Sequence, residues 1–193
     1  MTRPPDPLGA PARAIFFDRD GTLNVERNYV HTPREWEWIP GAVEALSRAA
    51  ALGFRTVIVT NQSGVGRGYY DRGAVESLHA WVAGALAERG VAVGGFYYCP
   101  HLEADRCDCR KPAPGMLVRA AKELNIDLSR SYLIGDKMAD VDAARAAGAV
   151  PILVRTGYGD AVRPGLSADV AVADDVIGAV DWIARREQRG EGS

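Results

Sequence analysis

Apolar segments with two different periodicities alternate along the chain, and this alternation restricts the possible folds more than any other feature. Apolar or β-branched runs at 14–17, 56–59, 96–98, 132–134, 150–154 and 169–172 are typical of strands. Between them, helices are predicted at 41–52, 74–89, 114–124, 138–147 and 175–186 from apolar spacing and from start and stop residues. The alternation predicts an α/β fold, a parallel sheet with helices on both faces.

Polar residues directly follow three of the predicted strands. They are Asp18, Thr60 and Asp136. Because ligands in such folds bind beyond the carboxyl ends of the strands, we expect these three side chains to converge. Asp18 and Asp20 point the same way if the segment is extended, and two adjacent carboxylates favour a bound cation or a shared proton. Taken alone, however, this pair also fits an exposed loop that happens to carry two acids.

Three cysteines and a histidine lie within 11 residues, in a loop at 99–109. The set is Cys99, His101, Cys107 and Cys109. Three thiolates and one imidazole complete a tetrahedral zinc site with no open position, which is typical of structural zinc. The alternative is a group of reduced thiols beside a surface histidine. Arg110 and Lys111 follow the last cysteine, so zinc would fix the loop that carries both cations.

Four short segments follow one another along the chain: 17–23 (FDRDGTL), 59–62 (VTNQ), 111–112 (KP) and 135–140 (GDKMAD). Together they resemble the signature motifs of the haloacid dehalogenase (HAD) superfamily of phosphatases. The resemblance implies a three-layer Rossmann-like fold and a phosphatase that forms an aspartyl-phosphate. Only about 40 residues separate Asp18 from Thr60, so we expect no full cap domain.

The resemblance also implies roles for individual residues. Asp18 would be the nucleophile and Asp20 the general acid and base. Thr60 and Lys111 would stabilise the transferred phosphoryl group. Mg²⁺ would bind the side chains of Asp18 and Asp136 and the main-chain carbonyl of Asp20.

The segments CPH at 99–101 and CDCRKP at 107–112 are shared by two related groups within this superfamily, the D-glycero-D-manno-heptose 1,7-bisphosphate phosphatases and the histidinol-phosphate phosphatases. The segments 28–31 (NYVH), 60–68 (TNQSGVGRG) and 112–117 (PAPGML) are more similar to the heptose group. The short loop between His101 and Cys107 is similar to the histidinol group. The resemblance therefore implies hydrolysis of the C7 phosphate of heptose 1,7-bisphosphate, in the biosynthesis of activated heptose precursors.

Other functions remain open. The alternatives are a phosphatase for histidinol phosphate or another small phosphomonoester, a 3′-phosphatase for nucleic-acid ends, and a catalytically silent binding domain stabilised by zinc. The expected substrate contacts are Asn24, Asn28, Asn61, Gln62, Ser63, Arg67, Arg110 and Lys111. Arg110 or Arg67 would hold the retained phosphate, because a guanidinium group binds phosphate through two hydrogen bonds. For Arg67, a solvated loop position is the competing interpretation.

Charge and hydropathy bear on the partners of the protein. The net charge of −2 gives no basic surface for nucleic acid, and no apolar run approaches the ~20 residues of a membrane helix. The Pro-rich N-terminus lacks the apolar core of a secretory signal. We therefore expect a cytoplasmic monomer that acts on a small sugar phosphate, without nucleic-acid or membrane partners. Residues 13–187 are expected to form a single domain between disordered tails at 1–12 and 188–193.

Overall fold

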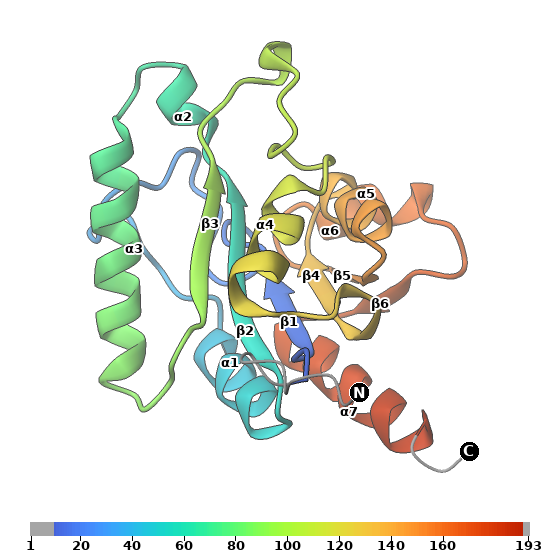
Figure 1. Cartoon of the computed structure of the whole chain (residues 1–193). Helices are drawn as coiled ribbons and strands as arrows, with labels where there is room; N and C mark the ends of the chain where they lie inside the picture. Colours follow the sequence, from blue (N-terminus) through green and yellow to red (C-terminus); the bar gives the residue numbers. More distant parts are fainter. Residues whose placement is uncertain (1–9, 191–193) are drawn as a thin grey trace, which may run out of the picture.

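The computed structural model describes residues 10–190 and contains one six-stranded sheet (Figure 1). Every adjacent pair of strands is parallel, and the strand order is β3-β2-β1-β4-β5-β6. The strands are β1 (Ala14–Phe17), β2 (Arg55–Asn61), β3 (Gly95–Cys99), β4 (Tyr132–Gly135), β5 (Val150–Val154) and β6 (Ala171–Ala173). The predicted fold class is confirmed, and each predicted strand overlaps an observed one.

Five long helices connect or follow the strands, as predicted. They are α1 (Ala42–Ala51), α3 (Arg72–Ala87), α4 (Gly115–Leu124), α5 (Met138–Ala147) and α7 (Val176–Gly190). Two short helices, α2 (Ser63–Gly66) and α6 (Gly159–Val162), and the 3₁₀ turns η1 (Glu103–Asp105), η2 (Leu128–Arg130) and η3 (Arg163–Gly165) complete the described elements. Asp71 caps α3 by accepting a hydrogen bond from the amide of Ala74, and Gly148 ends α5 at a φ of 77°.

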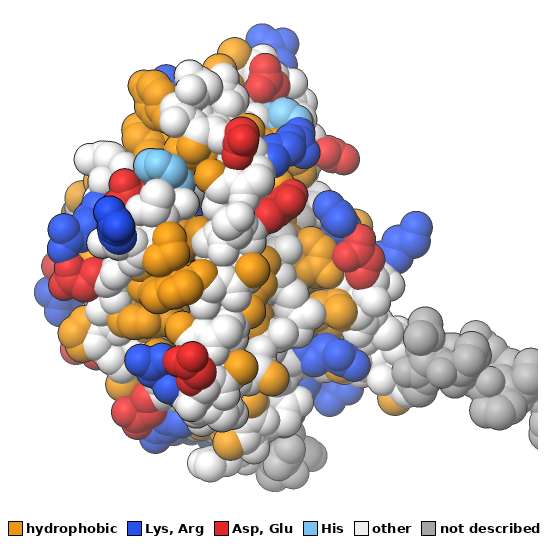
Figure 2. Space-filling view, turned by 90° about the vertical axis from the view of Figure 1, so that its left-hand side faces the viewer, with side chains coloured by type: hydrophobic (Ala, Val, Ile, Leu, Met, Phe, Trp, Pro, Cys, Tyr) orange, Lys and Arg blue, Asp and Glu red, His pale blue; other side chains and the backbone are white. Residues whose placement is uncertain are grey.

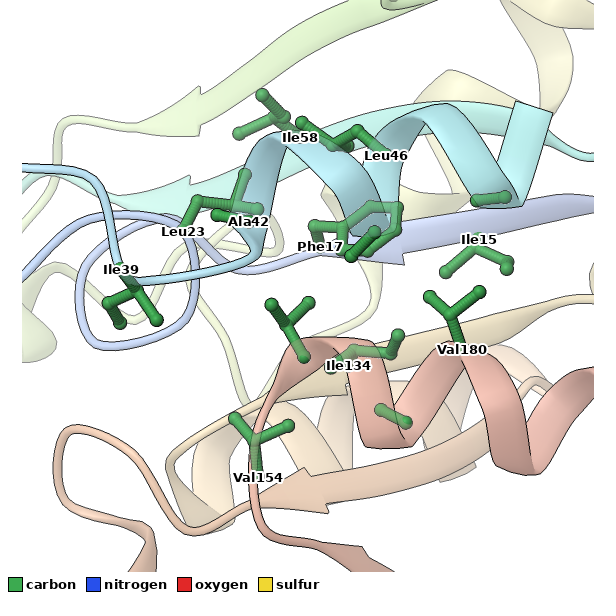
Figure 3. Close-up of a cluster of buried hydrophobic side chains, with 14 of the residues drawn as sticks. Ile15, Phe17, Leu23, Ile39, Ala42, Leu46, Ile58, Ile134, Val154 and Val180 are labelled. Atoms are coloured by element: carbon green, nitrogen blue, oxygen red, sulfur yellow. The ribbon is translucent and has the colours of Figure 1, made fainter. Parts of the chain in front are cut away.

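Successive residues of β1 belong to two different hydrophobic cores, because side chains alternate across a strand. Ile15 and Phe17 pack with α1, α3 and α7, and Figure 3 shows them beside Leu46 and Val180. The neighbouring residues of β1 pack on the opposite face, against α4 and α5. All four residues of β1 are fully buried. Helices therefore cover both faces of the sheet, which gives the three layers expected.

The order of the strands reverses at β1. The chain first adds β2 and β3 on one side of β1 and then adds β4, β5 and β6 on the other side. Ligands bind at this kind of strand-order reversal in open α/β sheets. The connection from β1 to β2 contains a loop and the single helix α1, so no full cap domain is inserted there. The segment after β3 rises beyond the carboxyl ends of the strands, next to α2 (Figure 1).

Two predicted boundaries differ from the structure. Ala12, which we expected in the N-terminal tail, exchanges main-chain hydrogen bonds of 2.8 Å with Asn125 and Asp127. Helix α7 continues to Gly190, although a tail was predicted from residue 188, because the polar Arg, Glu and Gln residues after its apolar stripe are good helix formers. The rest of the two predicted tails, 1–9 and 191–193, lies outside the described residues.

Within residues 10–190, no helix is long and apolar enough to cross a membrane. The face formed by α3 carries basic and acidic side chains side by side, with apolar ones between them (Figure 2). This face therefore offers no continuous basic surface.

Candidate active site

Three carboxylates meet at the carboxyl edge of the sheet. Asp18 follows β1, Asp136 follows β4, and Asp140 lies in the first turn of α5; all three are buried, and their ligand oxygens lie within 4.8 Å of one another. Asp136 Oδ2 accepts a 2.8 Å hydrogen bond from the amide of Tyr158. Among the described residues, Asp136 Oδ1 has no hydrogen-bond partner. A buried oxygen of this kind is free to bind a cation.

Two glycines make room for the Asp136 carboxylate. A Cβ atom at Gly21 would lie 2.2 Å from Asp136 Oδ2, and one at Gly157 would lie 2.1 Å from the same oxygen. Burial and the nearby charge of Asp18 raise the pKa of Asp136 to about 8. A hard divalent cation such as Mg²⁺ prefers carboxylate oxygens and would offset this repulsion, so the residues present fit such an ion. Asp140 Oδ2 accepts from the amide of Lys137 instead.

Lys111 pairs with two members of the carboxylate cluster, Asp18 and Asp140. Its Nζ atom is 2.6 Å from Asp18 Oδ1 and 2.6 Å from Asp140 Oδ1, and it donates to the carbonyl of Val59 at 3.0 Å. Burial alone would lower the pKa of Lys111, but the charges of Asp140 and Asp18 outweigh burial and raise it. The ammonium group is therefore charged where a phosphoryl group beside Asp18 would need neutralisation.

The side chain of Asn61, at the end of β2, fixes the main chain of Lys111. Its Nδ2 atom donates to the Lys111 carbonyl at 2.9 Å, and its Oδ1 atom accepts from the Lys111 amide at 3.0 Å. Both bonds join residues that are 50 positions apart in the chain. Asn61, predicted as a substrate contact, thus holds the loop that carries Lys111.

Asp20 is held by three side chains. Arg19 Nη2 lies 2.9 Å from both carboxylate oxygens, Asn24 Nδ2 donates to Oδ1 at 3.0 Å, and Gln62 Nε2 donates to Oδ2 at 3.0 Å. Burial would raise the pKa of Asp20, but the charge of Arg19 and these hydrogen bonds lower it below its usual value. Asn24, predicted as a substrate contact, is fully buried and orients Asp20.

Gln62 links Asp20 to the other polar groups of the rim. Its Nε2 atom also donates to Thr60 Oγ1 at 2.9 Å, and its Oε1 atom accepts from the Tyr70 hydroxyl at 2.9 Å. The ring of His31 stacks on Tyr70 with 4.6 Å between ring centroids. Burial raises the pKa of Tyr70 to about 12, so its hydroxyl remains a hydrogen-bond donor.

The predicted zinc ligands come together in the structure. The three sulfur atoms are 3.2–3.5 Å apart, and His101 Nδ1 lies 3.5 Å from Cys99 Sγ and 3.3 Å from Cys109 Sγ. Cys107 completes the group, whose four ligand atoms all lie within 4.8 Å of one another. Separations this short allow one ion to contact every ligand, so the cluster fits tetrahedral zinc.

An open cavity of about 740 Å³ lies over the carboxylates. Its lining contains most of the predicted site residues: Asp18, Asp20, Asn28, Thr60, Asn61, Gln62, Ser63, Arg110 and Lys111. Asn24 and Arg67 are not part of this lining. Arg67 is exposed at the end of α2, which agrees with the solvated interpretation.

Sequence reasoning missed two cations that line the cavity, Arg106 and Lys137. Lys137 pairs with Glu26 at 3.1 Å and lies 4.8 Å from the ring centroid of Tyr158. Arg106 is exposed, follows the 3₁₀ turn η1 and has a φ of 48°. The position of Lys137 inside the fourth motif was a usable signal for that residue. For Arg106 the sequence contains none, because a left-handed turn sets its direction.

Comparison with known proteins agrees with this fold and site. Residues 108–179 match the family model described as HAD-hyrolase-like. The class of protein is therefore a phosphatase of the HAD superfamily. A relative from Escherichia coli (strain K12), D-glycero-beta-D-manno-heptose-1,7-bisphosphate 7-phosphatase, is 47% identical over 178 residues, which cover 88% of this chain and 87% of the relative. The chain belongs to the D-glycero-D-manno-heptose-1,7-bisphosphate phosphatase family.

A second relative of the same name, from Pasteurella multocida (strain Pm70), is 47% identical over 152 residues, which cover 75% of this chain and 83% of the relative. Among solved structures, D,D-heptose 1,7-bisphosphate phosphatase from B. bronchiseptica, complexed with magnesium and phosphate, aligns with a TM-score of 0.84 and 34% identity. The alignment covers 90% of this chain and 99% of that one.

Proposed function

We propose that this protein hydrolyses the C7 phosphate of D-glycero-β-D-manno-heptose 1,7-bisphosphate through an aspartyl-phosphate on Asp18. The observation that carries the proposal is the ion pair between Lys111 and Asp18 at the base of an open cavity that is also lined by two arginines, Arg106 and Arg110. One cationic centre would serve the phosphate that reacts, and the other the phosphate that is retained. The names of the relatives support the heptose and its β anomer.

Asp18 would attack phosphorus as Asp20 protonates the leaving oxygen of the sugar. In the second step Asp20 would take a proton from water, whose oxygen attacks the aspartyl-phosphate and releases inorganic phosphate. Thr60 would donate its hydroxyl to the phosphoryl oxygens, and Lys111 would neutralise their charge. Hydrogen bonds from Asn24 and Gln62 hold the Asp20 carboxylate at the cavity and lower its pKa, which favours the ionised form that acts as the base in the second step.

Mg²⁺ is the cofactor we propose for the carboxylate cluster, where Asp18, Asp136 and the main-chain carbonyl of Asp20 would hold it. A bound Mg²⁺ would neutralise charge on the phosphoryl oxygens. The partnerless oxygen of Asp136 supports this assignment. The B. bronchiseptica enzyme, whose structure is a complex with magnesium and phosphate, supports it independently.

Zinc is the ion we propose for the cysteine and histidine cluster. A closed set of four ligands leaves no position for substrate, so the role would be structural. Arg110 and Lys111 directly follow Cys109, and Arg106 directly precedes Cys107. Zinc would therefore fix the direction of three cations that line the cavity.

The retained phosphate would be bound by Arg106 and Arg110. Of the four cations that line the cavity, Lys111 and Lys137 are paired with carboxylates. Arg106 and Arg110 have no carboxylate within ion-pair distance in the described part of the chain, and Arg110 donates only a 3.3 Å hydrogen bond to the carbonyl of His101. Asn28 and Ser63 line the same cavity, where they would contact the sugar.

The test is a comparison of kcat/KM with Mg²⁺ for both anomers of heptose 1,7-bisphosphate and for histidinol phosphate. Asp18→Asn serves as the blank. We expect a preference for the β anomer of about a hundredfold over histidinol phosphate, near 3 kcal/mol of transition-state binding. Preferred turnover of histidinol phosphate would overturn the substrate and keep the mechanism. Absence of turnover with any phosphomonoester would overturn both.

We also propose that the phosphatase domain, with the two boundaries corrected above, acts as one unit, as a monomer in the cytoplasm, without nucleic-acid or membrane partners. The net charge of −2 and the mixed charges on the α3 face support this (Figure 2). Sedimentation of the purified protein at working concentration and fractionation of the source cells check these points.

A further inference from the structure

Arg19 lies between the two aspartates of the first motif, and its side chain has no part in the mechanism above. It is fully buried, which is unusual for an arginine and requires polar partners. Its position in the sequence gives no reason for an arginine, because a small residue would also let Asp18 and Asp20 point into the cavity. The structure supplies the reason in the contacts of the guanidinium group.

The guanidinium group of Arg19 joins parts of the chain that are far apart. Its Nη2 atom lies 2.9 Å from both oxygens of Asp20 and donates to the carbonyl of Val30 at 2.6 Å. Its Nη1 atom lies 3.5 Å from His79 Nε2 in α3. Its Cζ atom lies 5.9 Å from the ring centroid of Trp36. One side chain thus contacts the carboxylate, the loop at 28–31 and α3.

The contact with Val30 matters because the same loop lines the cavity. Asn28 and Tyr29 precede Val30, both have positive φ values (54° and 63°), and both line the cavity. Such values are uncommon for residues other than glycine and persist only where the surroundings hold them. The short bond from Arg19 to Val30 is one such constraint. It fixes the cavity-lining loop to the same atom that holds Asp20.

His79 is the partner of the guanidinium group in α3. It is buried, and its ring stacks on Phe96 with 4.9 Å between centroids. Burial and the charge of Arg19 lower the pKa of His79 to about 3, so the ring is neutral and can accept a hydrogen bond from Nη1. The guanidinium group therefore contacts a carboxylate through Nη2 and a neutral ring through Nη1.

We propose that Arg19 is a positioning residue, which holds the Asp20 carboxyl group at the leaving oxygen and couples it to the loop at 28–31. The inference rests on the acid–base role given to Asp20 under the proposed function. In the step concerned, the bond between phosphorus and the leaving oxygen breaks, the bond from Asp18 to phosphorus forms, and the proton of Asp20 passes to the leaving oxygen. Arg19 keeps its own protons throughout.

The test uses the dependence of kcat/KM on the leaving group, because kcat/KM reports the first phosphoryl transfer. A nitrophenolate leaves without protonation, whereas a sugar alkoxide needs a proton. We therefore compare p-nitrophenyl phosphate with an alkyl phosphate that the wild-type protein hydrolyses. The first alkyl phosphate to use is the heptose bisphosphate. Arg19→Lys keeps the charge but loses the planar fork of donors. We expect it to reduce kcat/KM for the alkyl phosphate about tenfold more than for the aryl phosphate, the effect of one charge-assisted hydrogen bond.

Two control variants separate the possible failures. Asp20→Asn should reduce kcat/KM for the alkyl phosphate about a hundredfold or more beyond its effect on the aryl phosphate. If it does not, the acid–base role of Asp20 itself fails. Val82→Ala removes two buried methyl groups from α3 and should reduce kcat/KM equally for both substrates. Equal losses on both substrates for Arg19→Lys, with Asp20→Asn selective, would show that Arg19 only stabilises the fold and would overturn the inference.

A second variant covers the case in which Arg19→Lys does not fold. His79→Leu keeps Arg19 and Asp20 and removes only the ring beside Nη1. We expect a selective loss of about threefold in kcat/KM for the alkyl phosphate, smaller because the contact is longer and its acceptor is neutral. Equal effects of His79→Leu on the two substrates would also overturn the inference.

Discussion

The ammonium group of Lys111 lies 2.6 Å from Oδ1 of Asp18, so a charged pair occupies the base of the cavity before substrate binds. The same ammonium is 2.6 Å from Asp140, which would keep it in place if Asp18 formed the proposed bond to phosphorus. Because the charges are buried, their interaction is weakly screened by solvent. Phosphate that enters the cavity would therefore meet a cation whose position is already fixed.

Replacement of this cation should remove most of the activity. We expect Lys111→Met to reduce kcat/KM for p-nitrophenyl phosphate by about 10³-fold, because one preorganised donor to a developing charge contributes on this scale. Lys122→Met, at an exposed position of α4, is the matched control and should retain full activity. Circular dichroism checks that both variants are folded. A loss below about tenfold for Lys111→Met would contradict the assigned role.

Arg106 should affect only substrates that carry a second phosphate. We expect Arg106→Ala to lower kcat/KM for heptose 1,7-bisphosphate by about 10- to 100-fold, the effect of one hydrogen bond between charged groups. Turnover of p-nitrophenyl phosphate should not change, because that molecule carries no second phosphate for Arg106 to bind. Arg67→Ala is the matched control, since Arg67 lies outside the cavity. Equal losses on both substrates would place Arg106 in the fold of the loop and not in substrate binding.

Removal of the zinc ligands should affect both metal content and turnover. We expect Cys107→Ser to bring bound zinc, measured by plasma mass spectrometry, from about one ion per chain to near zero. The Tm should fall, and kcat/KM should fall with it, because Arg110 and Lys111 lose a fixed direction. Asp108→Asn changes the exposed residue between two ligands and is the control. Loss of zinc with unchanged turnover and stability would contradict the proposed function of the loop.

Stability in acid should depend on His79. Its pKa is about 3 in the folded protein and 6.5 in the unfolded chain, so only the unfolded chain binds a proton between these values. The contribution of His79 to the free energy of unfolding is therefore complete above pH 6.5. It falls as the pH falls, by about 1.4 kcal/mol between pH 7.5 and pH 5.5. His79→Leu should reduce the difference in unfolding free energy between these two pH values by this amount. Urea titrations with added zinc measure it, and an unchanged difference would show that His79 protonates without unfolding.

The sequence was sufficient to predict the strands and the position of the site. Strands buried on both faces, such as β1, appear as continuous apolar runs, and Asp18 and Asp136 follow such runs directly. Parallel pairing then brings their carboxyl ends to one edge. The cysteine cluster was equally accessible, because four soft ligands in a short loop have few other uses.

The direction of individual side chains was not accessible in the same way. Asn24 was expected to contact substrate, but a local turn, in which the amides of Leu23 and Asn24 donate to the carbonyl of Arg19, points it at Asp20. Arg106 was missed because its own backbone is left-handed, with a φ of 48°, and this sets the direction of its side chain. Both depend on backbone geometry that a pattern of residue types does not specify.

The pair of hydrogen bonds between the Asn61 side chain and the Lys111 main chain has a consequence for how this site can change during evolution. A side chain anchored in the sheet sets the height of the loop that carries Lys111, and the proposed zinc cluster would fix the segment just before it. The residues between His101 and Cys107 are then not needed to position Lys111. Insertions and deletions at that point are free to reshape the mouth of the cavity, and with it the choice of substrate, while the chemistry at its base stays the same.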